Sequence, residues 1–164
     1  MMDTSYRQFF ALTKEPFGAD IPRKDIMVTK ALGAMEERIH YTIRMGAIAL
    51  ITGEIGSGKS TSLRYVLGGL HPSEYRIIYV TASSGSILEL YRQILNELAI
   101  DVTGSSRSAM TRKIKQEVLD LTQGKKMKVA LIIDEASLLR LEVFTELHTL
   151  TQFCLLYTSP SPRD

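Results

Sequence analysis

The chain has 164 residues, of which 45% are hydrophobic and 23% charged, as is typical of one globular domain and not of a disordered or fibrous chain. Its 20 Lys and Arg against 18 Asp and Glu give a net charge of +2, too balanced for nucleic-acid binding by bulk charge alone. One Cys excludes a disulfide framework and a multi-cysteine metal site. No apolar run approaches the roughly 20 residues of a membrane span, and no signal peptide is visible, so we expect a cytoplasmic protein.

Hydrophobic periodicity predicts helices and strands that alternate along the chain. In segment 1–46 we expect a short helix over 6–17, an extended stretch over 25–29 and a helix from an N-cap at Thr29 to Arg44. Segment 47–153 is expected to form one core, with strands at 47–52, 76–82 and 129–133 and helices at 59–70, 86–98, 109–122 and 141–153. Because strands joined through helices run parallel, this order predicts an α/β fold with a parallel sheet between two helical layers.

Residues 53–60 read GEIGSGKS and match the Walker A pattern G-x-x-x-x-G-K-[ST] of phosphate-binding loops. Glycines let consecutive amides turn toward a phosphate, and the helix that follows adds its N-terminal amides. We expect Lys59 to reach the β- and γ-phosphates of ATP and the Ser60 hydroxyl to bind Mg²⁺. A glycine-rich surface turn is the alternative, but the position between an apolar strand and a helix favours a nucleotide site. The predicted ATP-binding residues are Gly53, Glu54, Ile55, Gly56, Ser57, Gly58, Lys59, Ser60 and Thr61.

Two acids, Asp134 and Glu135, end the apolar run 129–133. Parallel sheets bind ligands at the carboxyl ends of their strands, so we expect Asp134 to face the same crevice as the phosphate loop. There it would hold Mg²⁺ together with Ser60, as in a Walker B motif. Glu135 points elsewhere and is placed to polarise a water molecule as a general base. The alternative is that both acids only cap the next helix.

The adjacent Asp and Glu also bear on the reaction. A carboxylate that activates water favours hydrolysis of ATP to ADP and phosphate, with ATP and Mg²⁺ as cofactors and with Lys59 and Glu135 as catalytic residues. A P-loop kinase remains a minor alternative, because such kinases typically lack that Glu and carry an arginine-rich lid.

Several short motifs occur in a recognisable order: FFALTKEPF, TGEIGSGKS, RIIYV, LIIDEA and TELHTLTQF. Together they resemble the ExeA/GspA-like branch of the AAA ATPases, over about residues 6–153. That branch includes accessory ATPases of secretion pathways and helper ATPases of bacterial transposases. The two nucleotide motifs are shared by many ATPases, whereas the Phe9-Phe10 and Pro16-Phe17 opening and the LTQF segment narrow the resemblance.

The resemblance implies an ATP-binding module that forms homo-oligomeric rings or filaments and changes partners with its nucleotide state. It gives Lys59 and Ser60 the phosphate and metal roles, Asp134 the second metal role and Glu135 the water-activating role. It also implies that segment 1–46 packs on the nucleotide site through its paired aromatics, near adenine. Ordinary core packing of those aromatics is the alternative.

Two positions depart from the family pattern. Ser137 stands where family members commonly have Gln or His, and Gln152 stands where Asn is frequent. Neither change touches the phosphate chemistry, but either would alter how the γ-phosphate is sensed.

Residues 154–164, CLLYTSPSPRD, resemble one reading frame of the adapter used in transposase-based sequencing libraries. We therefore expect native sequence to end at Phe153 and the remainder to be a non-native tail, with a Pro/Ser linker as the alternative. After Phe153 the resemblance implies a further strand, between the phosphate-loop strand and the acidic strand, that carries a polar sensor. It also implies an arginine from a neighbouring subunit and a helical subdomain. Without these parts we expect the chain to fold poorly and its ATPase activity to be impaired.

The stretch 104–128 is rich in basic residues and holds only Glu117 and Asp120 as acids. Its basic residues are Arg107, Arg112, Lys113, Lys115, Lys125, Lys126 and Lys128. They would face DNA if the protein serves transposition, but a solvated helix face is the favoured alternative. The histidines, His40, His71 and His148, have no ligand spacing, so we expect no histidine metal site.

Two biological roles stay open. In the first, an ATP-bound oligomer binds double-stranded DNA and recruits a transposase. The stretch PFGADIPRKDIMVT favours this role, because it resembles the short transposon-associated members. In the second, the protein is an accessory ATPase for assembling secretion machinery in the cell envelope.

Overall fold

The computed structural model describes residues 6–13, 15, 21–83, 85–103 and 106–158, with the backbone alone for 150–158. The elements in chain order are α1 (Tyr6–Phe9), η1 (Arg23–Asp25), α2 (Lys30–Met45), α3 (Lys59–Leu67), β1 (Tyr75–Thr81), α4 (Ile87–Glu97), α5 (Arg107–Leu119), η2 (Asp120–Gly124), β2 (Lys128–Asp134), η3 (Ala136–Leu138) and α6 (Leu141–Thr158).

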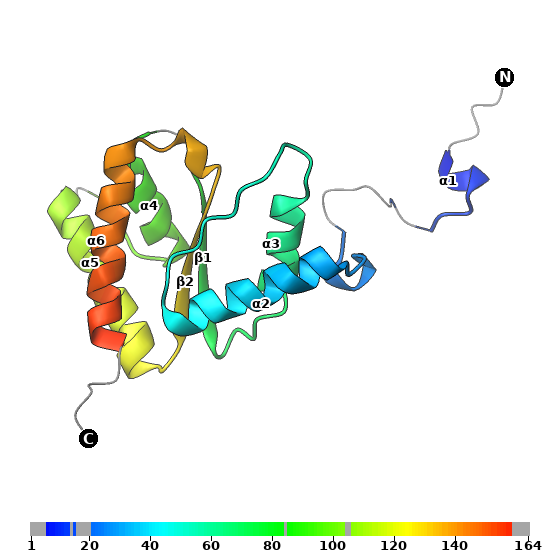
Figure 1. Cartoon of the computed structure of the whole chain (residues 1–164). Helices are drawn as coiled ribbons and strands as arrows, with labels where there is room; N and C mark the ends of the chain where they lie inside the picture. Colours follow the sequence, from blue (N-terminus) through cyan, green and yellow to red (C-terminus); the bar gives the residue numbers. More distant parts are fainter. Residues whose placement is uncertain (1–5, 14, 16–20, 84, 104–105, 159–164) are drawn as a thin grey trace.

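Strands β1 and β2 pair in parallel, in a register that runs from Tyr75 opposite Lys128 to Thr81 opposite Asp134. Helices α4, α5 and α6 lie on one side of this pair and α2 and α3 on the other (Figure 1). The predicted α/β architecture, with a parallel sheet between helical layers, is confirmed. Side chains alternate between the two faces along each strand, so both faces of the pair carry apolar residues. Helices cover both faces for this reason.

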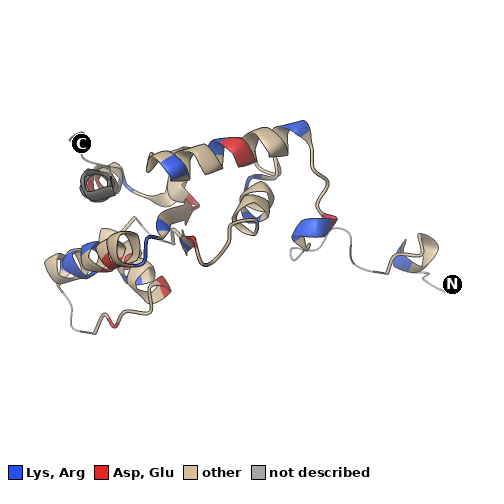
Figure 2. Cartoon of the chain, turned by 90° about the horizontal axis from the view of Figure 1, so that it is seen from below, with Lys and Arg blue, Asp and Glu red and all other residues tan. Residues whose placement is uncertain are grey.

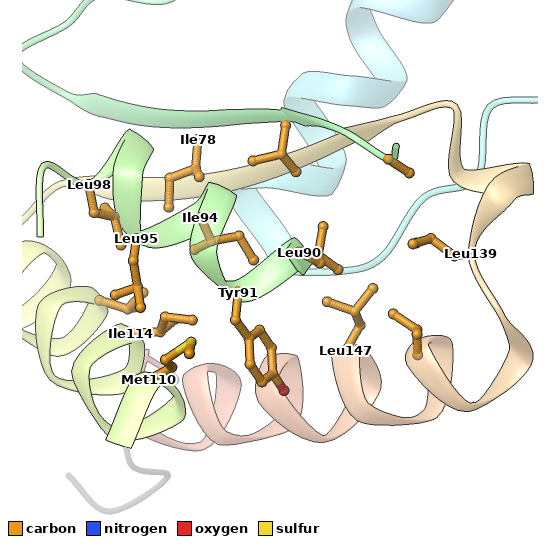
Figure 3. Close-up of a cluster of buried hydrophobic side chains, with 14 of the residues drawn as sticks. Ile78, Leu90, Tyr91, Ile94, Leu95, Leu98, Met110, Ile114, Leu139 and Leu147 are labelled. Carbon is orange, nitrogen blue, oxygen red and sulfur yellow. The ribbon is translucent and has the colours of Figure 1, made fainter. Parts of the chain in front are cut away.

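The larger core lies between the sheet and helices α4 to α6 (Figure 3). Ile78 and Val80 of β1 face it, and Ile94 and Leu95 of α4 are 1% and 0% exposed within it. Tyr91 is also buried there, and its hydroxyl donates a hydrogen bond of 3.1 Å to Glu146 of α6. Burial of each such side chain stabilises the fold by about 1.5–3 kcal/mol, so this core fixes the position of the sheet.

The second core lies on the opposite face and joins α3 to the sheet. Leu63 and Val66 of α3 pack with Ile39 of α2, and Tyr79 and Ile132 reach the same cluster from β1 and β2. Helix α2 begins where the sequence predicts, since the Thr29 hydroxyl accepts a hydrogen bond of 3.2 Å from the Leu32 amide. The helix ends at Met45, and its C-cap Gly46 has a φ of 61°, the left-handed conformation common at this position.

The strand predicted over 47–52 is wrong. The structure has no regular element there, and Ile48 and Leu50 are 62% and 77% exposed. A strand needs a neighbour for its backbone amides and carbonyls, and among the described residues the sheet consists of β1 and β2 only. The family resemblance implies a further strand between 47–52 and the acidic strand. No described segment occupies that position, so apolar composition alone does not make 47–52 a strand.

Several predicted boundaries also differ from the structure. Helix α1 ends at Phe9, whereas the predicted helix runs to Phe17, which lies outside the described residues. The 3-10 turn η1 takes in Asp25, where an extended stretch is predicted. Helix α3 ends at Leu67 and is followed by Gly68 and Gly69, which disfavour further helix. Helix α6 continues to Thr158 rather than ending at 153, and the origin of residues 154–164 stays a prediction.

Replacing Ile78 with Ala should lower the free energy of unfolding by about 2–5 kcal/mol, because Ile78 is 2% exposed within the larger core. Ile48→Ala is the matched control, which removes the same atoms from an exposed position and should change the free energy by less than about 0.5 kcal/mol. Chemical denaturation measures both variants. An equal loss for the two would contradict the assignment of 47–52 as exposed coil.

Candidate functional site

The phosphate loop, residues 53–60, follows the exposed segment 47–52 as coil and runs into the first two residues of α3 (Figure 1). Gly56 and Gly58 have φ angles of 82° and 81°, in the left-handed region that residues with a Cβ resist. Gly58 is the N-cap of α3, so the chain turns into the helix at this glycine. The free amides of the first helical turn therefore face the loop, which is the arrangement that binds phosphate in other proteins.

Lys59 closes the loop on itself. Its Nζ donates hydrogen bonds of 2.9 Å to the Gly53 carbonyl and 2.8 Å to the Glu54 carbonyl. The side chain is half-buried, whereas Glu54 and Ile55 are exposed. Lys59 would exchange these two carbonyls for phosphate oxygens when a nucleotide binds, which keeps its charge satisfied in both states.

Asp134 lies at the carboxyl end of β2, where three donors meet its carboxylate. The Tyr79 hydroxyl donates a hydrogen bond of 2.5 Å to Oδ2, and the Glu135 amide donates one of 2.9 Å to Oδ1. These bonds, a hydrogen bond from the Ser60 hydroxyl and the charge of Lys59 lower the pKa of Asp134, with Tyr79 the largest cause. Asp134 is therefore ionised at neutral pH, beside the start of α3.

Predicted metal-binding residues Ser60 and Asp134 are thus brought together. A hydroxyl and an ionised carboxylate are hard oxygen donors that suit Mg²⁺. No group of three His, Cys, Asp or Glu side chains with metal-binding proximity occurs in the described part of the chain. A magnesium ion at this position would need further oxygens from phosphate or water, as Mg²⁺ typically takes in nucleotide sites.

Glu135 is exposed and follows Asp134 in an unusual backbone conformation, with φ 53° and ψ 33°. A residue with a Cβ adopts this left-handed conformation at a cost, and such residues cluster at functional sites. Glu135 is the N-cap of η3 and is exposed, whereas Asp134 is half-buried and hydrogen-bonded to Tyr79. The two acids therefore have different surroundings, as two different roles require.

Tyr79 is a residue of this site that sequence reasoning missed. Burial raises its pKa to about 12, with the hydrogen bond to Asp134 as the next cause, so the phenol stays a donor at neutral pH. The only sequence signal is positional. Tyr79 lies on β1 with its side chain on the same face as Asp134, which becomes visible once the strand register is known.

The paired aromatics of the N-terminal segment are exposed to solvent. Phe9 and Phe10 contact each other edge to face, with ring centroids 4.9 Å apart, and are 75% and 65% exposed. Helix α1 lies apart from the sheet and its helices (Figure 1). These two residues do not pack in the core, their place near adenine stays a prediction, and Pro16 and Phe17 lie outside the described residues.

A family model described as an AAA domain matches residues 43–161. The match covers the phosphate loop, the Asp134-Glu135 pair and the helices between them, and it runs past Phe153. No curated protein and no solved structure matches the chain. Among the helices that the structure describes, none has the length and apolar character to cross a membrane.

Proposed function

The chain belongs to the AAA domain family of nucleotide-binding P-loop ATPases, and on that premise we propose that it binds ATP with Mg²⁺ and hydrolyses it. The observation that supports this most strongly is the place of the Asp134 carboxylate beside the start of α3, where it accepts a hydrogen bond from Ser60 and feels the charge of Lys59. These residues supply a cation for phosphate, a hydroxyl and an ionised carboxylate. A glycine-rich surface turn without a ligand would not require an ionised carboxylate such as Asp134 beside it.

In the proposed reaction the amides of the loop and of the first turn of α3 bind the phosphates of ATP. Lys59 leaves the Gly53 and Glu54 carbonyls and donates to the β- and γ-phosphate oxygens. Ser60 and Asp134 would hold Mg²⁺, which would neutralise part of the phosphate charge. Glu135 accepts a proton from the attacking water, and the leaving ADP takes the electron pair of the broken P–O bond.

Two variants separate binding from hydrolysis. Lys59→Ala should weaken nucleotide binding strongly, because the cation for the phosphates is lost. Glu135→Gln should bind ATP as tightly as the wild type but lower turnover by about 10²- to 10⁴-fold, because the amide cannot accept the proton. Fluorescent-nucleotide titration measures binding and phosphate release measures turnover. A Glu135→Gln variant with wild-type turnover would contradict the role of Glu135.

We further propose that the protein is a nucleotide-dependent switch that assists DNA transposition, assembling as an oligomer on double-stranded DNA. Three exposed residues, Arg112 on α5 and Lys125 and Lys126 just after η2, support this proposal as contacts for DNA phosphates. Other basic residues of the stretch 104–128 already have protein partners. Arg107 forms an ion pair with Glu146, and the Lys113 Nζ donates to the Asp101 carbonyl at 2.6 Å.

Figure 2 shows the Lys and Arg residues spread over several elements and interspersed with acids. DNA binding by one chain is therefore expected to be weak, and stable binding requires several copies side by side. ATP would favour the assembled state, so DNA retention would depend on the nucleotide. A role in secretion predicts no such dependence.

Retention on double-stranded DNA should be higher with ATP than with ADP, and it should fall steeply as salt concentration rises. The triple variant Arg112→Ala, Lys125→Ala, Lys126→Ala should lose retention while it keeps its nucleotide affinity, because none of the three residues lies at the phosphate loop. A filter-binding assay at low salt measures this. Indifference to DNA at low salt, with ATP bound, would contradict the transposition role and favour the secretion role.

A further inference from the structure

The phenol of Tyr79 reaches from β1 to the carboxylate of Asp134 on the neighbouring strand β2. In the parallel register Tyr79 of β1 lies opposite Ile132 of β2, and Asp134 lies two residues further along β2, on the same face. Paired strands lie about 4.8 Å apart and rise about 3.3 Å per residue, so these two residues lie about 8 Å apart at their backbones, within reach of an aromatic side chain. The hydrogen bond of 2.5 Å from the Tyr79 hydroxyl to Asp134 Oδ2 therefore follows from the register.

The ring of Tyr79 is held in place by the core. It packs against the cluster of Ile39, Leu63 and Val66, which joins α2 and α3 to the sheet. A side chain packed between a helix and a sheet keeps one rotamer, so its hydroxyl has a fixed position. The position of the hydroxyl that donates to Asp134 is therefore fixed by packing, unlike that of a mobile surface side chain.

We propose that Tyr79 is a positioning residue that fixes the Asp134 carboxylate for Mg²⁺ binding, an inference that rests on the proposed ATPase function. Asp134 has two other donors, the Glu135 amide and the Ser60 hydroxyl. Ser60 is itself expected to turn toward the metal. Tyr79 and the Glu135 amide then remain, one on each carboxylate oxygen, and together they fix the plane of the group.

The test compares Tyr79→Phe with Tyr75→Phe in the full chain. Both variants remove one hydroxyl from β1 and keep the ring, and Tyr75 lies at the opposite end of the strand, where its ring faces Lys128. Binding of a fluorescent ATP analogue is titrated with Mg²⁺ and also measured in EDTA. For Tyr79→Phe we expect about tenfold more Mg²⁺ to be needed for half-maximal effect, with affinity in EDTA unchanged. For Tyr75→Phe we expect both values of the wild type.

A second readout needs no ligand. Because Tyr79 holds the carboxylate that accepts from the Glu135 amide, Tyr79→Phe should speed hydrogen exchange at that amide, measured by NMR, while Tyr75→Phe should not. Equal Mg²⁺ dependence in all three proteins would overturn the inference while the proposed function stands. A wild type that binds no nucleotide would overturn the proposed function, and the exchange rates would then decide on Tyr79. Unchanged exchange in Tyr79→Phe would overturn its positioning role.

Discussion

The site depends on the packing of α3 against one face of the sheet. Leu63 and Val66 of α3 meet Tyr79 and Ile132 of the strands, and this contact brings the first residues of α3 to the end of β2. The segment before the phosphate loop contributes little to this placement, because residues 47–52 are exposed and belong to no strand. The packing of α3, which follows the loop, therefore holds the loop beside Asp134. Tyr79 serves both purposes, since its ring packs under α3 and its hydroxyl binds Asp134.

The site has two parts: one that is fixed by packing, and the exposed phosphate loop. Asp134, Tyr79 and the start of α3 are connected through the apolar cluster and hydrogen bonds. The loop itself is exposed, and the bonds from Lys59 to its Gly53 and Glu54 carbonyls hold it closed. A bound phosphate would compete for the same ammonium group, which would couple nucleotide binding to the conformation of the loop. Such coupling is what a nucleotide-dependent switch requires.

Much of the fold was predictable because its signals are local. Helices α2 to α6 and strands β1 and β2 follow from periodicity, and the Thr29 cap follows from one hydroxyl. The pairing of Ser60 with Asp134 followed from the rule that parallel strands present ligands at their carboxyl ends. The strand over 47–52 was not predictable from its apolar residues, because a strand exists only with a neighbour. Tyr79 was missed because its role depends on strand register, which periodicity does not contain.

Nucleotide affinity after a change in the cluster under α3 tests this account most directly. Val66→Ala removes two methyl groups from a position of α3 that is 0% exposed, and Val118→Ala removes the same groups from α5 in the other core. Both variants should lose stability, but only Val66→Ala should bind a fluorescent ATP analogue more weakly than the wild type, measured below both melting temperatures. Equal affinities for the two variants would contradict the claim that α3 packing holds the phosphate loop beside Asp134.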